Sequence, residues 1–268
     1  MAGFLAVAAW ETLQPRRALV VSTARRWLVH GAFVVLGRVA LWLVFPVSAV
    51  GLSIAVAGAR YGLLNRSVLP FSVRFVLTFL LLDLVLYGQH YLLHHVPLLW
   101  RLHRVHHSDR EYDLTTGIRF HPIESLYLQG VILLVIELTA PPVSAVICFE
   151  LVNVVQTFFA HANLRLPPRF ERAIRFVQVT PELHRVHHSL EPSDHNTNFG
   201  AVFTFWDRLF GTLRTEPHLG DAQFEFGLKD VSAAQSVRVG NLLALPFRSE
   251  PRPLTDSAVP QAVRQAAP

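Results

Sequence analysis

The chain has 268 residues, of which 51% are apolar and 16% are charged. Soluble domains usually carry about 25% charged residues, so this composition excludes an ordinary soluble protein and favours one that resides in lipid. The net charge of +5 comes from arginine, because Lys229 is the only lysine. We interpret the arginine surplus as contact with anionic lipid headgroups and expect no binding of nucleic acid. The single cysteine, Cys148, excludes a disulfide framework and a thiolate metal site.

The first part of the chain, residues 1–68, is predicted to be a membrane anchor region. Residues 1–10 are apolar but fall short of the roughly 20 residues that cross a bilayer, so we expect an interfacial anchor or the end of a longer helix. Residues 27–45 are long and apolar enough for a spanning helix. Arginines between positions 16 and 26 mark the preceding side as cytoplasmic by the positive-inside rule. The short run 47–59 predicts a re-entrant or interfacial segment.

Three further apolar runs predict spanning helices at residues 70–93, 123–139 and 143–161. The last two are separated by Pro141 and Pro142 and read as a helical hairpin. Together with the first span they give about four spanning helices. The expected fold is therefore all-α, an integral membrane helical bundle that carries a cytoplasmic, histidine-rich helical cap.

The chain becomes more polar after Pro168. Residues 169–177 have the pattern of a helix that lies on a membrane surface or packs with one apolar face. Thr180-Pro181-Glu182 is a helix start, with a capping hydroxyl, a proline in the first turn and an acid favoured by the helix dipole. Residues after about 245 are rich in proline, alanine and serine. We therefore expect a central domain at 69–215 and a partly disordered tail at 216–268.

A seven-residue stretch that occurs twice carries the chemistry. Leu102–Ser108 reads Leu-His-Arg-Val-His-His-Ser, and the same letters return at Leu183–Ser189. Each copy places histidines at positions i, i+3 and i+4, which share one face of a helix. Neutral imidazole is a common ligand for iron, zinc and copper, so the repeat predicts a metal site with both copies contributing.

Other histidines are expected to join the two repeats at the same membrane surface. His90 and His94 lie one turn apart at the end of a predicted span, and His161 ends the last span. Nine imidazoles exceed what one zinc ion binds and suit two metal ions. His121, just before Pro122, is a tenth candidate, either as a ligand or as a hydrogen-bonding residue behind one.

Several motifs between about Asp83 and Leu213 together resemble the fatty acid hydroxylase / sterol desaturase superfamily of membrane di-iron enzymes. They are Asp83…Tyr87…His90-x-x-x-His94, Trp100–Ser108, Phe120-His121-Pro122-x-Glu124, Phe159–Leu164 and Thr180–Ser189. The segments Asn198-Phe199-Gly200 and Trp206–Thr212 resemble the stretch that follows in bacterial members. In some members a further histidine stands where this chain has Thr157.

The resemblance implies an oxidoreductase that hydroxylates a C–H bond of a fatty-acyl, sterol or carotenoid-like lipid with two irons and O2. No catalytic residue is expected beyond the metal ligands. The predicted ligands are His90, His94, His103, His106, His107, His121, His161, His184, His187 and His188. Asp83, Glu124, Asn163 and Asn198 are predicted to hold ligands in place from behind. Electrons would come from an external ferredoxin- or cytochrome-type donor, because no haem, flavin or nicotinamide motif is present.

Three alternatives remain open on the sequence. A lipid desaturase would use the same site. A membrane metal-binding or transport protein would need ligands near the bilayer midplane, whereas the repeats lie in charged segments at one surface. A zinc-dependent membrane hydrolase would need fewer histidines and a catalytic carboxylate beside the metal.

Overall fold

A computed structural model describes residues 2–58, 61–221 and 224–248 of the chain. Apart from three isolated β-bridges, the regular structure in these ranges is helical, which confirms the all-α prediction. The predicted anchor region is described from residue 2 onward. The last 20 residues of the predicted tail lie outside the described residues.

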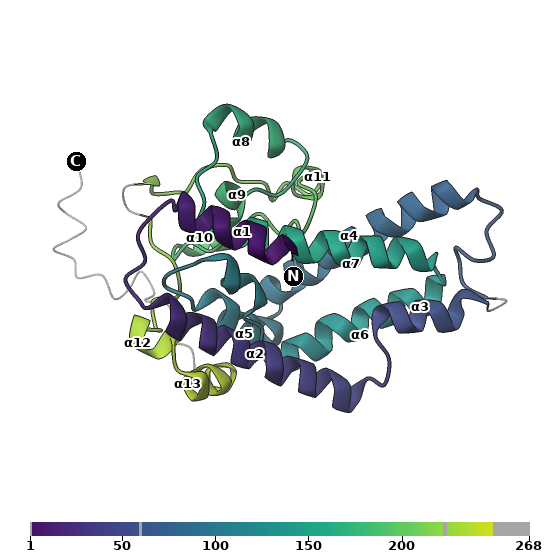
Figure 1. The fold of residues 1–268 in the computed structure, drawn as a ribbon, viewed down its shortest axis with the longest axis horizontal. Coiled ribbons are helices and arrows are strands. Elements are labelled where there is room, and N and C mark those ends of the chain that lie inside the picture. Colours follow the sequence, from purple (N-terminus) through teal and green to yellow (C-terminus); the bar gives the residue numbers. More distant parts are fainter. Residues whose placement is uncertain (1, 59–60, 222–223, 249–268) are drawn as a thin grey trace, which may run out of the picture.

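The central layer is made of long apolar helices that lie along the longest axis of the molecule (Figure 1). They are α2 (Thr23–Val44), α3 (Ala49–Ala57), α4 (Phe71–His95), α6 (Pro122–Thr139) and α7 (Val143–His161). By length and composition the described residues hold four candidate membrane spans, with α2 and α3 counted as one. This confirms the predicted number of spans.

The helices alternate in direction along this axis. Helices α2 and α6 run one way, whereas α4 and α7 run back (Figure 1). Consequently the last turns of α4 and α7 lie at the same end of the bundle as the first turns of α2 and α6. Proline places these boundaries, because Pro122 occupies the first turn of α6 and Pro142 precedes α7. The histidines that end α4 and α7 therefore meet at one end of the molecule.

Shorter elements cover that end. They are α1 (Ala2–Leu13), α5 (Pro97–His107), η1 (Leu114–Ile118), α8 (Pro168–Ile174), α9 (Pro181–His187), α10 (Pro192–His195), α11 (Phe205–Leu209), α12 (Ala233–Ser236), α13 (Val239–Ala244) and η3 (Leu245–Phe247). The predicted start of α9 is confirmed, since the Thr180 hydroxyl accepts a hydrogen bond from the Leu183 amide. Helix α8 is shorter than the segment expected at 169–177.

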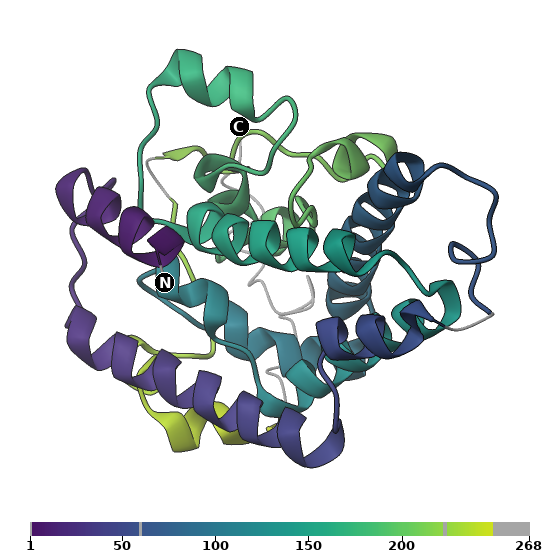
Figure 2. The same ribbon diagram turned by 45° about the vertical axis from the view of Figure 1, so that its right-hand side comes forward.

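Both ends of the described chain pack against the core. Helix α1 lies beside the C-terminal part of α7 (Figure 2), where Val7 is buried with Ala162 and Leu164. Near the other end, Leu242 and Leu245 are buried in one cluster with residues of α2 and α5. Residues 228–245 therefore contribute to the packed cap. Partial disorder within the tail 216–268 stays a prediction.

Candidate metal centre

Nine buried or half-buried histidines form two neighbouring groups. The five-histidine group contains His90, His94, His103, His107 and His187, and the four-histidine group contains His106, His161, His184 and His188. Within each group the candidate ligand nitrogens all lie within 4.8 Å of one another. Nine of the ten histidines predicted as ligands are thus brought together.

Each copy of the repeated stretch contributes to both groups. In the first copy His103 and His107, one helical turn apart, join the five-histidine group, while His106 joins the other. In the second copy the pattern is exchanged: His184 and His188 join the four-histidine group, and His187 the five-histidine group. Helices α5 and α9 therefore lie across the boundary between the groups. The His107 and His188 rings stack there, with centroids 4.4 Å apart.

The nitrogens that face the middle of the five-histidine group have no protein partner. Among the described residues, the Nε2 atoms of all five members are buried and make no hydrogen bond. A buried imidazole nitrogen normally has a hydrogen-bond partner, so five orphaned atoms in one place require another explanation. Their convergence fits a metal ion bound through Nε2.

The opposite nitrogens of several ligand candidates are held by the backbone. The Nδ1 atom of His90 lies 3.0 Å from the Phe199 carbonyl oxygen, and that of His187 lies 2.7 Å from the Thr197 carbonyl. On α7 the His161 Nδ1 lies 2.8 Å from the Thr157 carbonyl one turn earlier. Because a carbonyl only accepts, Nδ1 carries the proton and Nε2 keeps its lone pair for a metal.

Burial keeps these imidazoles neutral. It lowers the pKa of His103 to about 3. For His107 and His188, burial and then the neighbouring imidazoles hold the pKa well below its usual range. A neutral imidazole is the form that binds metal, so the electrostatics of the site match the ligand role.

Glu124 contacts a ligand candidate as predicted. Its Oε1 atom lies 2.5 Å from the Nδ1 atom of His103, and both side chains are buried. Such a carboxylate fixes the ring orientation and makes the metal-facing nitrogen more basic. His121 lies at the start of the same helix and is not in either group. Its Nδ1 atom accepts a hydrogen bond from the Ile123 amide and caps α6.

Asp83 and Asn163 do not contact imidazoles, which corrects the predicted contacts. The carboxylate of Asp83 accepts hydrogen bonds from the amides of Val202 and Phe203 and from the indole of Trp206. It ties the segment after α10 to α4. Asn163 forms two hydrogen bonds with the backbone of Arg17. Each side chain therefore fixes the surrounding loops and not a ligand.

Asn198 supports two ligand candidates indirectly, because it fixes the turn whose backbone carbonyls contact them. Its φ angle is +56°, a left-handed conformation that asparagine tolerates better than most residues. Its side-chain amide donates to the carbonyls of Leu183 and Arg214. The adjacent carbonyls of Thr197 and Phe199 are those that hold His187 and His90. Sequence reasoning missed these two carbonyls, because a backbone group leaves no trace in residue identity.

A buried charge network behind the first repeat was also missed. The Arg26 guanidinium donates to Asp109 at 2.6 Å and forms an ion pair with Asp113, and both contacts are buried. Arg119 donates to the Val105 carbonyl and to the Ser108 hydroxyl, at the end of α5. This network fixes the C-terminal turn that carries His106 and His107. Arg26 is one of the arginines between positions 16 and 26 that indicated the orientation of the chain in the membrane, and nothing in the sequence distinguishes it as buried.

The family of this chain follows from a direct comparison of sequences. The profile of the fatty acid hydroxylase family matches residues 75–212, which is about half of the chain and contains all nine grouped histidines. The chain belongs to the fatty acid hydroxylase family. No solved structure matches it.

Individual members of the fatty acid hydroxylase family resemble this chain over the same region. Alkylglycerol monooxygenase of Xenopus tropicalis is 32% identical over 52% of this chain and 30% of its own length. The ornithine lipid hydroxylase OlsE of Rhizobium tropici is 32% identical over 55% of this chain and 44% of its own length. Cholesterol 25-hydroxylase of Homo sapiens is 31% identical over 51% of this chain and 49% of its own length. The matches thus span between 30% and 49% of the length of these relatives.

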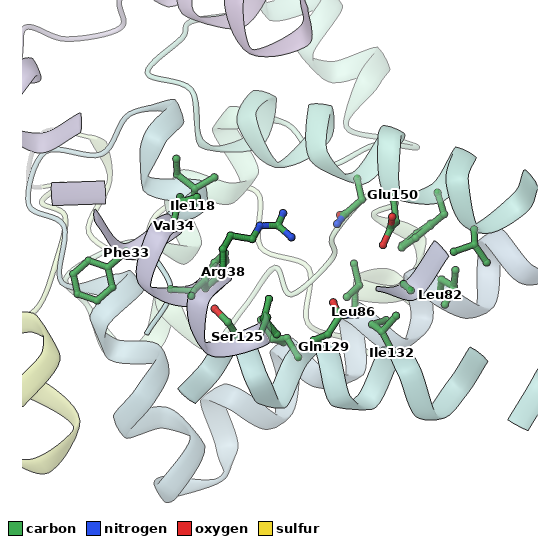
Figure 3. Close-up of a pocket in the computed structure, with 18 residues that line it drawn as sticks. Phe33, Val34, Arg38, Leu82, Leu86, Ile118, Ser125, Gln129, Ile132 and Glu150 are labelled. Carbon is green, nitrogen blue, oxygen red and sulfur yellow. The ribbon is translucent and has the colours of Figure 1, made fainter. Parts of the chain in front are cut away.

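An apolar space leads to the histidines of this family member. A cavity of about 190 Å³ is lined by His90, His103, His106, His161 and His184 and by apolar residues. A second cavity of about 340 Å³ lies between α2, α4, α6 and α7 (Figure 3). Leu86, Phe120, Leu128 and Asn153 line both. The two spaces are therefore neighbours with common walls, and a long apolar molecule can extend from one toward the other.

Proposed function

We propose that this chain is a membrane-bound di-iron oxygenase that hydroxylates a C–H bond of a lipid with O2. The observation that supports this most strongly is the pair of histidine groups at one end of the bundle, in one of which all five Nε2 atoms are buried without a hydrogen bond. Nine imidazoles without a thiolate suit two iron ions better than one zinc ion. The likeness to enzymes named as monooxygenases and hydroxylases of lipids agrees with it.

In this proposal the protein holds the two irons, orients the imidazole rings that bind them and surrounds the lipid substrate. The five-histidine group would hold one iron and the four-histidine group the other. Carbonyls of the Asn198 turn and the Glu124 carboxylate keep the rings of His90, His187 and His103 in one orientation. Iron supplies the redox chemistry with O2 when bound. The mainly apolar walls of the two cavities would accommodate a lipid chain and leave one of its carbons beside the ligands.

The site also has to receive electrons from outside. No redox cofactor motif is found in the sequence, so we propose an external ferredoxin- or cytochrome-type donor. Exposed arginines, among them Arg25, Arg165 and Arg172, lie on segments outside the four candidate spans or at the start of the first. A cytoplasmic orientation of the histidine end would follow from the positive-inside rule. Both remain part of the proposal.

Incubation with isotopically labelled O2 tests this function. The iron-loaded chain, a reductase with its electron carrier and a membrane lipid extract should give a lipid product that contains one labelled oxygen atom. Products with a new double bond and no labelled oxygen would indicate desaturation at the same site. Absence of any oxidised lipid, with iron bound and the donor active, would contradict the proposal.

A further inference from the structure

The larger cavity contains charged and polar groups that the proposed chemistry does not use. Arg38 comes from α2, Gln129 from α6, and Glu150 and Asn153 from α7, and all four line this otherwise apolar space. Figure 3 shows the Arg38 side chain reaching into the cavity and the Glu150 carboxylate directed toward it from the other side. All four belong to candidate membrane spans.

Their hydrogen-bonding capacity is not used within the described part of the chain. Among the described residues no side-chain hydrogen bond, and no ion pair within 4.0 Å, joins the exposed Arg38 to the half-buried Glu150, although both line the same cavity. Ionised groups in an apolar membrane interior are costly unless they have partners. If Arg38 and Glu150 served only to neutralise each other, we would expect their side chains to form a direct ion pair. An open pair that faces a cavity leaves room for a ligand between the two groups.

The chemistry of the pair defines the ligand group. A guanidinium only donates hydrogen bonds, and an ionised carboxylate only accepts them. Their net charge is zero, so the space between them favours an uncharged group that both accepts and donates. A hydroxyl is the smallest group that does both. A carboxylate or an ammonium group would instead meet repulsion from one side of the pair.

The position of the pair relative to the histidines defines the shape of the ligand. Glu150 lies three helical turns before His161 on α7, which is about 16 Å along the helix axis. The walls between the two places are mainly apolar, with Leu86, Phe120 and Leu128 shared by both cavities. A molecule that touched both ends would therefore be elongated and apolar along most of its length.

We propose that Arg38 and Glu150 bind a hydroxyl group at the far end of an elongated lipid whose other end reaches the histidine groups. This inference rests on the proposed function, because it treats the two cavities as one substrate site. It adds a specificity determinant: the chain selects lipid alcohols, and the bound hydroxyl sets which carbon lies beside the ligands.

Binding in nanodiscs tests this directly. The iron-loaded full chain is titrated with a labelled long-chain primary alcohol and with the methyl ether of the same chain length. The ether cannot donate to Glu150. One buried hydrogen bond to a charged group corresponds to a preference of about tenfold for the alcohol. Glu150→Gln should reduce this preference to about twofold. Arg38→Met removes a donor from which the oxygen atoms of both ligands accept, so it should weaken binding of the alcohol and of the ether alike, by about tenfold, and leave the preference unchanged. Arg74→Met is the matched control, because it removes an arginine of α4 that lines a different cavity.

The outcomes separate this inference from the proposed function. A preference that Glu150→Gln leaves unchanged, or alcohol binding that Arg38→Met leaves unchanged, with bound iron unaltered, would overturn the hydroxyl site even if lipids are oxidised. A preference lost in Glu150→Gln, together with weaker binding of both ligands in Arg38→Met and neither effect in Arg74→Met, supports the site. If the chain shows that loss yet oxidises no lipid with any donor, the hydroxyl site stands and the oxygenase proposal fails.

Discussion

At the scale of single residues, the ligand candidates are fixed from behind by groups of two kinds. Backbone carbonyls hold the Nδ1 atoms of His90, His187 and His161, and a carboxylate holds that of His103. For His90, His187 and His103 the arrangement leaves Nε2 without a hydrogen bond. The Nε2 atom of His161 lies 2.9 Å from that of His184 and 3.2 Å from that of His106. The i, i+3, i+4 spacing of the repeat places imidazoles on a shared helix face, but these supporting contacts decide which nitrogen binds.

Removal of the charge on Glu124 should weaken metal binding. We expect Glu124→Gln to lower iron affinity by about tenfold to a hundredfold, because a neutral amide supports His103 less well than a carboxylate does. Iron affinity is measured by competition with a chelator of known strength. Glu137→Gln is the control, since Glu137 lies at the far end of the same helix and bonds to Tyr61. Equal affinities for the two variants would contradict this role.

His121 should be dispensable for metal binding. Its side chain caps α6, and asparagine is a good substitute at such a position. His121→Asn should therefore keep the full iron content, whereas His121→Ala should keep iron but lose about 1 kcal/mol of stability. Metal analysis and thermal unfolding of both variants check this. Loss of one iron from His121→Asn would show that His121 is a ligand after all.

At the scale of elements, the end of α5 depends on a buried ion-pair network that no local pattern reveals. Arg26 begins α2 and reaches Asp109, just beyond the first repeat, and Asp113, before η1. Thr116 on η1 also donates to Asp109. Gly117 allows η1 to approach α7, because a Cβ atom there would lie 2.8 Å from the His161 ring. The network thus connects three elements around the ligand candidates.

Breaking this network should be strongly destabilising. We expect Arg26→Met to cost about 3–5 kcal/mol, because it leaves the buried Asp113 without its cation and leaves Asp109 only the more distant Arg119, at 3.8 Å. Arg25→Met is the neighbouring control, since Arg25 is exposed. Unfolding of both variants in mild detergent is followed by the loss of helical signal. A difference below about 1 kcal/mol between them would refute the importance of the network.

The contact between α1 and η1 should make stability depend on pH. Burial, with a contribution from Asp113, raises the pKa of Glu11 from 4.5 to about 7. The folded protein therefore holds this proton more tightly than the unfolded chain. The stability from that protonation is present below about pH 4.5 and is lost as the pH rises through about 7, by about 3 kcal/mol. Between pH 5 and pH 8, Glu11→Gln should lose less thermal stability than the original chain. Parallel pH profiles would contradict this.

At the scale of the whole molecule, the long apolar runs and the histidine repeats predicted the helical bundle and the gathering of nine histidines. The bundle and the gathering of histidines could be predicted because each follows from a pattern within a single helix. The apolar run 143–161, for example, ends at His161. The sequence did not predict the partners of Asp83 and Asn163, because these lie on segments far away in the chain. It also did not predict the cavity between the spans, which depends on how helices pack.

The most direct test of the central claim is the iron content of the purified chain compared with single-histidine variants of each group. We predict about two irons per chain, and about one in both His187→Ala, from the five-histidine group, and His188→Ala, from the four-histidine group. His95→Ala is the control, because His95 is exposed beside His94 and stacks on Tyr91; it should keep both irons. One zinc per chain, or an iron content that neither group variant changes, would contradict the di-iron account.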